Sequence, residues 1–245
     1  FSREDFRDEG ALLEEINSLE NILSWSSSNH LLIMFHDDGM CVTPVYREAA
    51  LVSSEVRELT ESQRTNLEDY RVFSHYELLE KLLNIVGRQF ILDIIGQKED
   101  YILTADNFLK MLLIIIRSRC NVPIVIMGET GCGKTSLVRF LATEIMQEGF
   151  DVINFHAGVK EHHIIEKMNE IIQRAEILKV TENKVWVFLD EINTCDCLGL
   201  ITEIICHKTM RGTKLPDNIV FIAACNPYKV RRNTNEVGLI KQRIA

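Results

Sequence analysis

Hydrophobic residues change their spacing near residue 123, and the change divides the chain into two regions. In the first region they recur every three or four positions, as on one face of a helix. This spacing predicts helices over residues 5–25, 52–64, 75–95 and 107–118. Two short apolar runs, Leu31–Phe35 and Cys41–Tyr46, flank a polar segment that contains Asp-Asp-Gly and predict a β-hairpin. We therefore expect the first region to be mostly helical, with one hairpin.

After Pro123, short apolar runs alternate with longer amphipathic stretches. The apolar runs predict strands over residues 124–127, 152–156, 185–189 and 219–224. The stretches between them predict helices over residues 134–147, 160–179 and 197–211. Strands that are apolar at successive positions are buried on both faces. The alternation therefore predicts an α/β fold, in which helices flank a mainly parallel sheet.

Net charge separates the same two regions. Residues 1–100 carry 20 acidic and 9 basic side chains, whereas residues 101–245 carry 16 acidic and 18 basic ones. Neither region has the basic surface that bulk binding to nucleic acid needs, so we expect no nucleic-acid partner. The longest aliphatic run, Met111–Ile116, is far too short for a transmembrane segment. The seven cysteines show neither a disulfide framework nor a zinc spacing, which is typical of a cytoplasmic protein.

The most specific motif follows the first predicted strand of the second region. Residues 128–135 read Gly-Glu-Thr-Gly-Cys-Gly-Lys-Thr and match the phosphate-binding P-loop pattern, with a strand before it and a helix after it. Glycines allow the tight turn, and successive N–H groups of such a loop can surround an anion. Lys134 can reach the β- and γ-phosphates, and the Thr135 hydroxyl can bind Mg²⁺. The expected nucleotide-binding residues are Gly128, Glu129, Thr130, Gly131, Cys132, Gly133, Lys134, Thr135 and Ser136.

Two acidic residues, Asp190 and Glu191, end the predicted strand that begins at Val185. The carboxyl ends of strands in α/β sheets are where ligands bind. Here Asp190 would hold Mg²⁺, and Glu191 would orient and activate the attacking water. We therefore expect Asp190 and Thr135 to be the metal-binding residues.

Three further groups of polar residues admit more than one interpretation. Asn226, at the end of the last predicted strand, could contact the γ-phosphate or the attacking water, or could simply begin a turn before Pro227. His156 could hold Glu191 away from the water, although it could equally be an ordinary strand-end residue. The basic residues that follow Asn226 could contact phosphate, a neighbouring module or only solvent; they are Lys229, Arg231 and Arg232. The pair His162 and His163 lacks the order of a helical zinc motif.

In this order and spacing, the motifs resemble those of AAA+ ATPases. The similarity is greatest to the mysterin-type giant RING-finger ubiquitin ligases, which carry AAA+ modules. It rests on residues 128–135, on Leu-Asp-Glu-Ile-Asn-Thr-Cys at 189–195 and on Ala-Cys-Asn-Pro-Tyr at 224–228. Residues 29–32 and 43–47 are similar to the connector between modules of that family. The resemblance implies an acidic helical connector over residues 1–101 and an AAA+ core over 102–245. The chain would be a piece of a longer protein, with the small helical lid outside it.

The same resemblance implies a role for each matching residue. Lys134 and Thr135 correspond to the P-loop pair, Asp190 and Glu191 to the acids for metal and water, and Asn226 to the first sensor. Lys134, Glu191 and Asn226 would then be the catalytic residues, with ATP and Mg²⁺ as cofactors. The implied partners are neighbouring AAA+ modules of the same polypeptide and, through the parent protein, the ubiquitin machinery.

Three alternatives to ATP hydrolysis remain open from the sequence. Nucleotide could serve as a structural ligand without significant turnover. The acidic connector could act as a scaffold for basic partners. GTP could replace ATP, because no residue clearly recognises the base.

Overall fold

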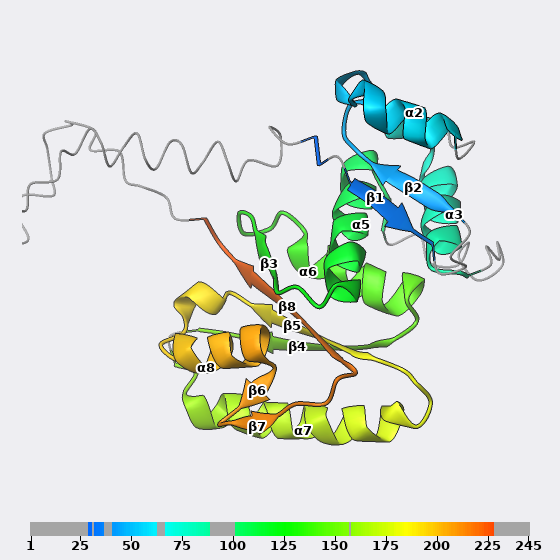
Figure 1. Ribbon diagram of the computed structural model, residues 1–245. Helices are drawn as coiled ribbons and strands as arrows, with labels where there is room; N and C mark the ends of the chain where they lie inside the picture. Colours follow the sequence, from blue (N-terminus) through cyan, green and yellow to red (C-terminus); the bar gives the residue numbers. More distant parts are fainter. Residues whose placement is uncertain are drawn as a thin grey trace, which may run out of the picture.

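A computed structural model describes residues 29–30, 32–36, 41–62, 67–88, 101–156 and 158–227 (Figure 1). The helix predicted over residues 5–25 and the basic residues 229, 231 and 232 lie outside the described residues. Within them, a small region of helices and one hairpin packs beside a larger α/β region (Figure 1).

Four parallel strands form the sheet of the larger region. They are β3 (Ile124–Met127), β4 (Gly149–Asn154), β5 (Val185–Asp190) and β8 (Ile219–Cys225), in the spatial order β3-β8-β5-β4. The apolar run of β5 is buried at every position from Val185 to Leu189, as expected for a central strand covered on both faces. Because all four strands are parallel, the P-loop, Glu191 and Asn226 leave the sheet at the same edge.

Two clusters of buried side chains cover the two faces of this sheet. On β5, Trp186 and Phe188 pack in one cluster, and Val185, Val187 and Leu189 pack in the other. The first face is covered by α5 (Ala105–Arg119), α6 (Lys134–Phe140) and the π-helical turn η3 (Leu141–Ile145). The second face is covered by α7 (Glu161–Lys179), α8 (Leu198–Thr202) and the π-helical turn η5 (Glu203–His207). The predicted α/β fold is confirmed.

The smaller region consists of the predicted hairpin and short helices. Strands β1 (Leu32–Phe35) and β2 (Val42–Val45) pair antiparallel. The helical segments are η1 (Ala49–Leu51), α2 (Ser54–Ser62), η2 (Tyr70–Val72) and α3 (His75–Ile85). Ser74 and Glu77 form a capping box that fixes the start of α3. Buried side chains of this region belong to the same cluster as α5 and Trp186, so its core is continuous with one face of the sheet.

A second contact joins the two regions near the start of β4. Arg88, just after α3, donates hydrogen bonds to the Met146 carbonyl and to the Gln147 side chain. Gln147 has a positive φ of 53°, which turns the chain from η3 into β4. The guanidinium thus holds the turn that leads into this edge strand of the sheet.

The structure differs from the predicted elements at three places. The helix predicted over residues 134–147 becomes a π-turn at Leu141, and the next strand begins at Gly149 rather than at residue 152. The helix predicted over 197–211 ends at His207. A hairpin follows, with strands β6 (Thr209–Met210) and β7 (Thr213–Lys214). Arg211 and Gly212 both have positive φ, as a two-residue hairpin turn requires.

This second hairpin is held by one carboxylate. Glu203 accepts hydrogen bonds from the Gly212 N–H at 2.8 Å and from the Thr209 hydroxyl at 3.0 Å. These bonds lower the pKa of Glu203, with the Gly212 N–H as the largest cause.

Across the described residues, none of the helices combines the length and the apolar character that crossing a membrane would take.

The hydroxyl of Tyr70 yields a stability prediction, because it donates a buried hydrogen bond to the Pro44 carbonyl at 2.7 Å. Tyr70→Phe removes this donor, and we expect the free energy of unfolding of the chain to fall by about 1–2 kcal/mol. Tyr76 is 48% exposed, so Tyr76→Phe is the matched control and should change stability by less than about 0.5 kcal/mol. Urea denaturation of the three proteins measures this, and equal stability of the two variants would contradict it.

Candidate nucleotide-binding site

The loop of residues 128–135 joins β3 to α6 at the carboxyl edge of the sheet. Gly131 and Gly133 have φ of 81° and 84°, in the left-handed region where residues with a Cβ are strained. Gly133 directly precedes α6, so this conformation sets how the loop enters the helix. The first N–H groups of a helix have no partner within it and carry a partial positive charge. The loop therefore has the backbone geometry of an anion-binding turn.

Gly128 permits a close approach inside this loop. A methyl group on its Cα would lie 2.8 Å from the Cys132 sulfur, closer than real contacts allow. The Gly128 N–H donates to the Cys225 carbonyl at 3.2 Å, which fixes the start of the loop to the end of β8. Burial raises the pKa of the Cys225 thiol, and the nearby Lys134 lowers it by a smaller amount.

Lys134 lies over the loop and connects it to the neighbouring strand. Its ammonium donates to the carbonyls of Gly128 at 2.8 Å and Glu129 at 3.0 Å, and to Asn226 Oδ1 at 3.1 Å. The side chain is thus held at the point where the loop and the end of β8 meet. An ammonium in this position can bind phosphate oxygens as a point charge.

Two hydrogen bonds place the acidic residues of β5 beside the loop and β8. The Thr135 hydroxyl donates to Asp190 Oδ2 at 2.9 Å. Asn226 Nδ2 donates to Glu191 Oε1 at 3.3 Å. The structure therefore brings the five residues singled out by the motifs into one site: Lys134, Thr135, Asp190, Glu191 and Asn226.

Hydrogen-bonding chemistry determines the orientation of the Asn226 amide. An ammonium can only donate and a carboxylate can only accept, so Oδ1 must face Lys134 and Nδ2 must face Glu191. The amide therefore joins the cation of the loop to the second acid of β5.

Glu191 has an unusual backbone conformation for a residue with a long side chain. Its φ is 57° and its ψ is 40°, in the left-handed region. The same conformation occurs at turn residues outside this site, such as Gln147 and Arg211, so at Glu191 it indicates a tight turn. Here Thr194 donates to the Glu191 carbonyl from its N–H at 2.9 Å and from its hydroxyl at 2.8 Å. These bonds form the 3-10 turn η4 (Ile192–Thr194) that directly follows Glu191.

Four further residues of the predicted site lie at the surface. Glu129, Thr130, Cys132 and Ser136 are exposed on the loop or on the first turn of α6. His156 accepts a hydrogen bond from the Gly158 N–H at 3.2 Å, whereas the hydrogen bond that Glu191 Oε1 accepts comes from Asn226. Of the two interpretations of His156, these bonds fit that of an ordinary strand-end residue.

Metal binding by a cluster of protein ligands is not seen in the described part of the chain. No group of three or more His, Cys, Asp or Glu side chains there has suitable geometry. A nucleotide-bound Mg²⁺ needs fewer protein ligands, because phosphate oxygens and waters complete its coordination. The adjacent oxygens of Thr135 and Asp190 fit such a site.

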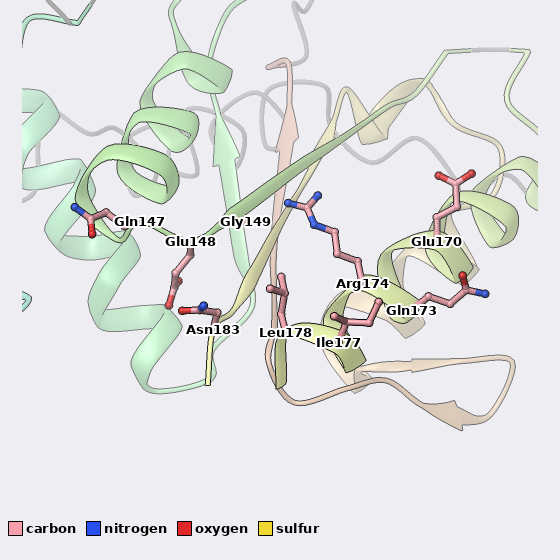
Figure 2. Close-up of a pocket in the computed structure, with 9 residues that line it drawn as sticks. All are labelled: Gln147, Glu148, Gly149, Glu170, Gln173, Arg174, Ile177, Leu178 and Asn183. Atoms are coloured by element: carbon pink, nitrogen blue, oxygen red, sulfur yellow. The ribbon is translucent and has the colours of Figure 1, made fainter. Parts of the chain in front are cut away.

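A pocket of about 530 Å³ lies elsewhere, between the start of β4 and the second half of α7 (Figure 2). Its lining includes Gly149, Arg174, Leu178 and Asn183, and none of the predicted site residues. Gly149 is at the amino end of β4, whereas the P-loop follows the carboxyl end of β3. This pocket is therefore separate from the candidate nucleotide site.

Comparison with known protein families shows to which family the chain belongs. A family model described as the RNF213 AAA domain matches residues 101–229. The chain belongs to this RNF213 AAA domain family. The resemblance to RING-finger AAA+ ligases that the motifs predicted is thereby confirmed.

Two curated relatives of this RNF213-family chain cover much of its length. It is 32% identical over 245 residues to the E3 ubiquitin-protein ligase RNF213 of Mus musculus, an alignment that spans 88% of the chain and 5% of the mouse protein. It is 43% identical over 145 residues to the E3 ubiquitin-protein ligase rnf213-beta of Danio rerio, which spans 56% of the chain and 3% of that protein. The chain thus spans about a twentieth or less of the length of these relatives.

The solved structure of C. elegans PCH-2 aligns over 52% of this chain and 39% of the PCH-2 chain, with 16% sequence identity and a TM-score of 0.35.

One residue of this candidate site lies in the quoted run of residues 189–195 but had no role assigned from the sequence. Asn193 Oδ1 accepts a hydrogen bond from the Asn226 N–H at 3.3 Å. The available signal was its place in the short turn after Glu191. That signal is weak, because asparagine is common in turns for local backbone reasons.

The contact between Gly128 and Cys132 yields a prediction about the loop. Gly128→Ala should lower the free energy of unfolding by about 0.5–1.5 kcal/mol, because the new methyl group forces the sulfur of the exposed Cys132 out of its position. Adding Cys132→Ala removes the sulfur and should restore most of the loss. The next atom is Lys134 Cδ at 3.6 Å, an ordinary contact distance.

Thermal denaturation of both single variants and the double variant measures this coupling. Gly199→Ala is the matched control, because a methyl group there meets nothing within 4 Å. Additive effects of the two substitutions would contradict the predicted overlap.

Proposed function

We propose that this chain binds ATP with Mg²⁺ at residues 128–136 and hydrolyses it. The single observation that carries the proposal is the side-chain network in which Asn226 joins Lys134 to Glu191 while Thr135 joins Asp190. A P-loop by itself binds phosphate. The additional acids and the amide, at the same edge of the sheet, provide what hydrolysis needs beyond binding.

In this proposal each residue has a defined task. The N–H groups of the loop and Lys134 bind the phosphates, and Lys134 would exchange its carbonyl contacts for phosphate oxygens. Thr135 and Asp190 would hold Mg²⁺, which neutralises phosphate charge when it is bound. Glu191 would accept a proton from the attacking water, and Asn226 would orient the γ-phosphate or that water. Catalysis would come from positioning and from stabilising the charge that develops in the transition state.

The consequence for the longer protein is also part of the proposal. The relatives are named E3 ubiquitin-protein ligases, and this chain spans only a small share of them. We place ATP hydrolysis in this chain and ubiquitin transfer in other parts of the parent protein. Conformational change would pass from this module to neighbouring AAA+ modules of the same cytoplasmic polypeptide.

A competition assay between ATP and GTP tests the choice of nucleotide.

Binding is tested by removing the ammonium. In the longer protein, Lys134→Ala should weaken ATP binding at this site at least tenfold, because a charge-assisted contact to phosphate is worth about 1.5–3 kcal/mol. Lys179→Ala, at the exposed end of α7, is the control and should leave binding unchanged. Isothermal titration calorimetry with Mg²⁺ measures both. Equal affinity of Lys134→Ala and the unmodified protein would refute nucleotide binding by this loop.

Hydrolysis is tested separately by removing the base. Glu191→Gln should reduce ATP turnover by this module about 100-fold or more, because general-base catalysis contributes about 10²–10⁴-fold. ATP affinity should remain within about twofold, because the contacts of Lys134 are unaffected. Glu176→Gln, on the exposed face of α7, is the control. If the longer protein with Glu191→Gln binds ATP and its turnover is unchanged, that turnover does not depend on Glu191 and catalysis at this site is refuted.

A further inference from the structure

Asn193 occupies the middle of η4, the turn that follows Glu191. Its Oδ1 accepts the hydrogen bond of the Asn226 N–H at 3.3 Å. The bond crosses from the end of β5 to the end of β8, between residues 33 positions apart in the chain. It therefore connects the two segments that carry Glu191 and Asn226.

The N–H that Asn193 binds is the first one beyond β8. That strand ends at Cys225, so the Asn226 N–H lies past the sheet ladder, and at this exposed position the Asn193 side chain is its hydrogen-bond acceptor. The next residue, Pro227, has no N–H and restricts Asn226 to extended conformations. The sheet ladder before Asn226, the proline after it and the Asn193 bond together determine where the Asn226 side chain points.

The position of that side chain is sensitive to small displacements. Its amide spans two charged groups, with Lys134 at 3.1 Å from Oδ1 and Glu191 at 3.3 Å from Nδ2. A displacement of about 1 Å would break one of these contacts, and misplacements of that size at active sites can cost about 100-fold in rate. An anchor on the Asn226 backbone therefore acts on the geometry of the reaction.

The local backbone explains why the anchor lies at position 193. Glu191 adopts a left-handed conformation, and Thr194 donates twice to its carbonyl. This closes a tight turn that carries the side chain of Asn193 to β8. The residue has to offer an acceptor oxygen to an N–H donor, and an amide does so without adding negative charge beside Glu191.

We infer that Asn193 is a positioning residue for ATP hydrolysis, which holds the Asn226 backbone so that its amide lies between Lys134 and Glu191. The inference rests on the proposed function of this site. Asn193 itself needs no contact with the nucleotide, so its loss should affect turnover and leave affinity unchanged.

The test compares four substitutions in the longer protein, with ATP turnover and ATP affinity measured for each. Asn193→Ala and Asn193→Leu remove the acceptor, and the leucine keeps a similar side-chain size. Both should lower kcat about tenfold to 100-fold while the Kd for ATP stays within about twofold. Asn193→Asp keeps an acceptor oxygen at the same place but adds a negative charge beside Glu191, so it should recover only part of the loss, with a turnover at least about threefold above that of Asn193→Leu. Asn169→Ala makes the same chemical change on the exposed face of α7 and should have no effect.

The outcomes separate this inference from the proposed function. Glu191→Gln is measured alongside, and it must reduce turnover for the module to be hydrolytic; if it does not, both ideas fail. If Glu191→Gln reduces turnover while Asn193→Ala and Asn193→Leu do not, only the role of Asn193 is overturned. The role is also overturned if aspartate is as slow as leucine, or if all three variants at position 193 lose ATP binding together with turnover.

Discussion

The insertion of β8 between β3 and β5 is the constraint on which the site depends. Parallel pairing on both sides of β8 fixes the ends of three strands at one edge. Lys134 and Asn226 are 92 positions apart in the sequence, yet their side chains are in contact there. Bringing such distant segments together costs loop-closure entropy, which the pairing of the strands must offset. The site therefore forms only when the sheet is complete. Its geometry is therefore a property of the fold rather than of any one loop.

Packing on both faces of the sheet supports this edge. On one face, α7 and α8 pack against alternate residues of β5 and β8. On the other, α5, α6 and the smaller region fill a single continuous core that includes Trp186 and Phe188. The residues of the site lie above this core on turns that are short and hydrogen bonded. A rigid sheet with short turns at its edge can hold charged groups at fixed distances, which electrostatic catalysis requires.

Much of the fold and the site could be predicted from the sequence, for physical reasons that differ between residues. The strands were recognisable because burial on both faces requires apolar residues at successive positions. The P-loop was recognisable because Gly131 and Gly133 must adopt positive φ and Lys134 must be a cation. The π-turns at Leu141 and Glu203 were not, because their apolar spacing does not differ from that of a continuous helix over a single turn.

Three other features depend on contacts that the sequence pattern does not reveal. Two interpretations of His156 were open from the sequence, and its bond to Gly158 fits an ordinary strand-end residue, because that bond depends on the local path of the chain. Asn193 belongs to the quoted run of residues 189–195, but its role could not be predicted because its partner is a backbone N–H, which every residue except proline has. The hairpin at 209–214 depends on two bonds to the Glu203 carboxylate, one from the Thr209 hydroxyl and one from the Gly212 N–H in the turn.

The continuous core on one face has a practical consequence for anyone who divides this chain. The boundary between residues 101 and 102, which the family resemblance implies, stays a prediction. Phe108 and Leu112 of α5, on the AAA+ side of that boundary, are buried in the same cluster as Leu78 and Leu82 of α3, on the other side. A fragment cut at residue 102 would expose this apolar surface of α5 to water. Exposed patches of this kind promote aggregation, so a stable fragment of the AAA domain needs the residues of α3 that cover this face.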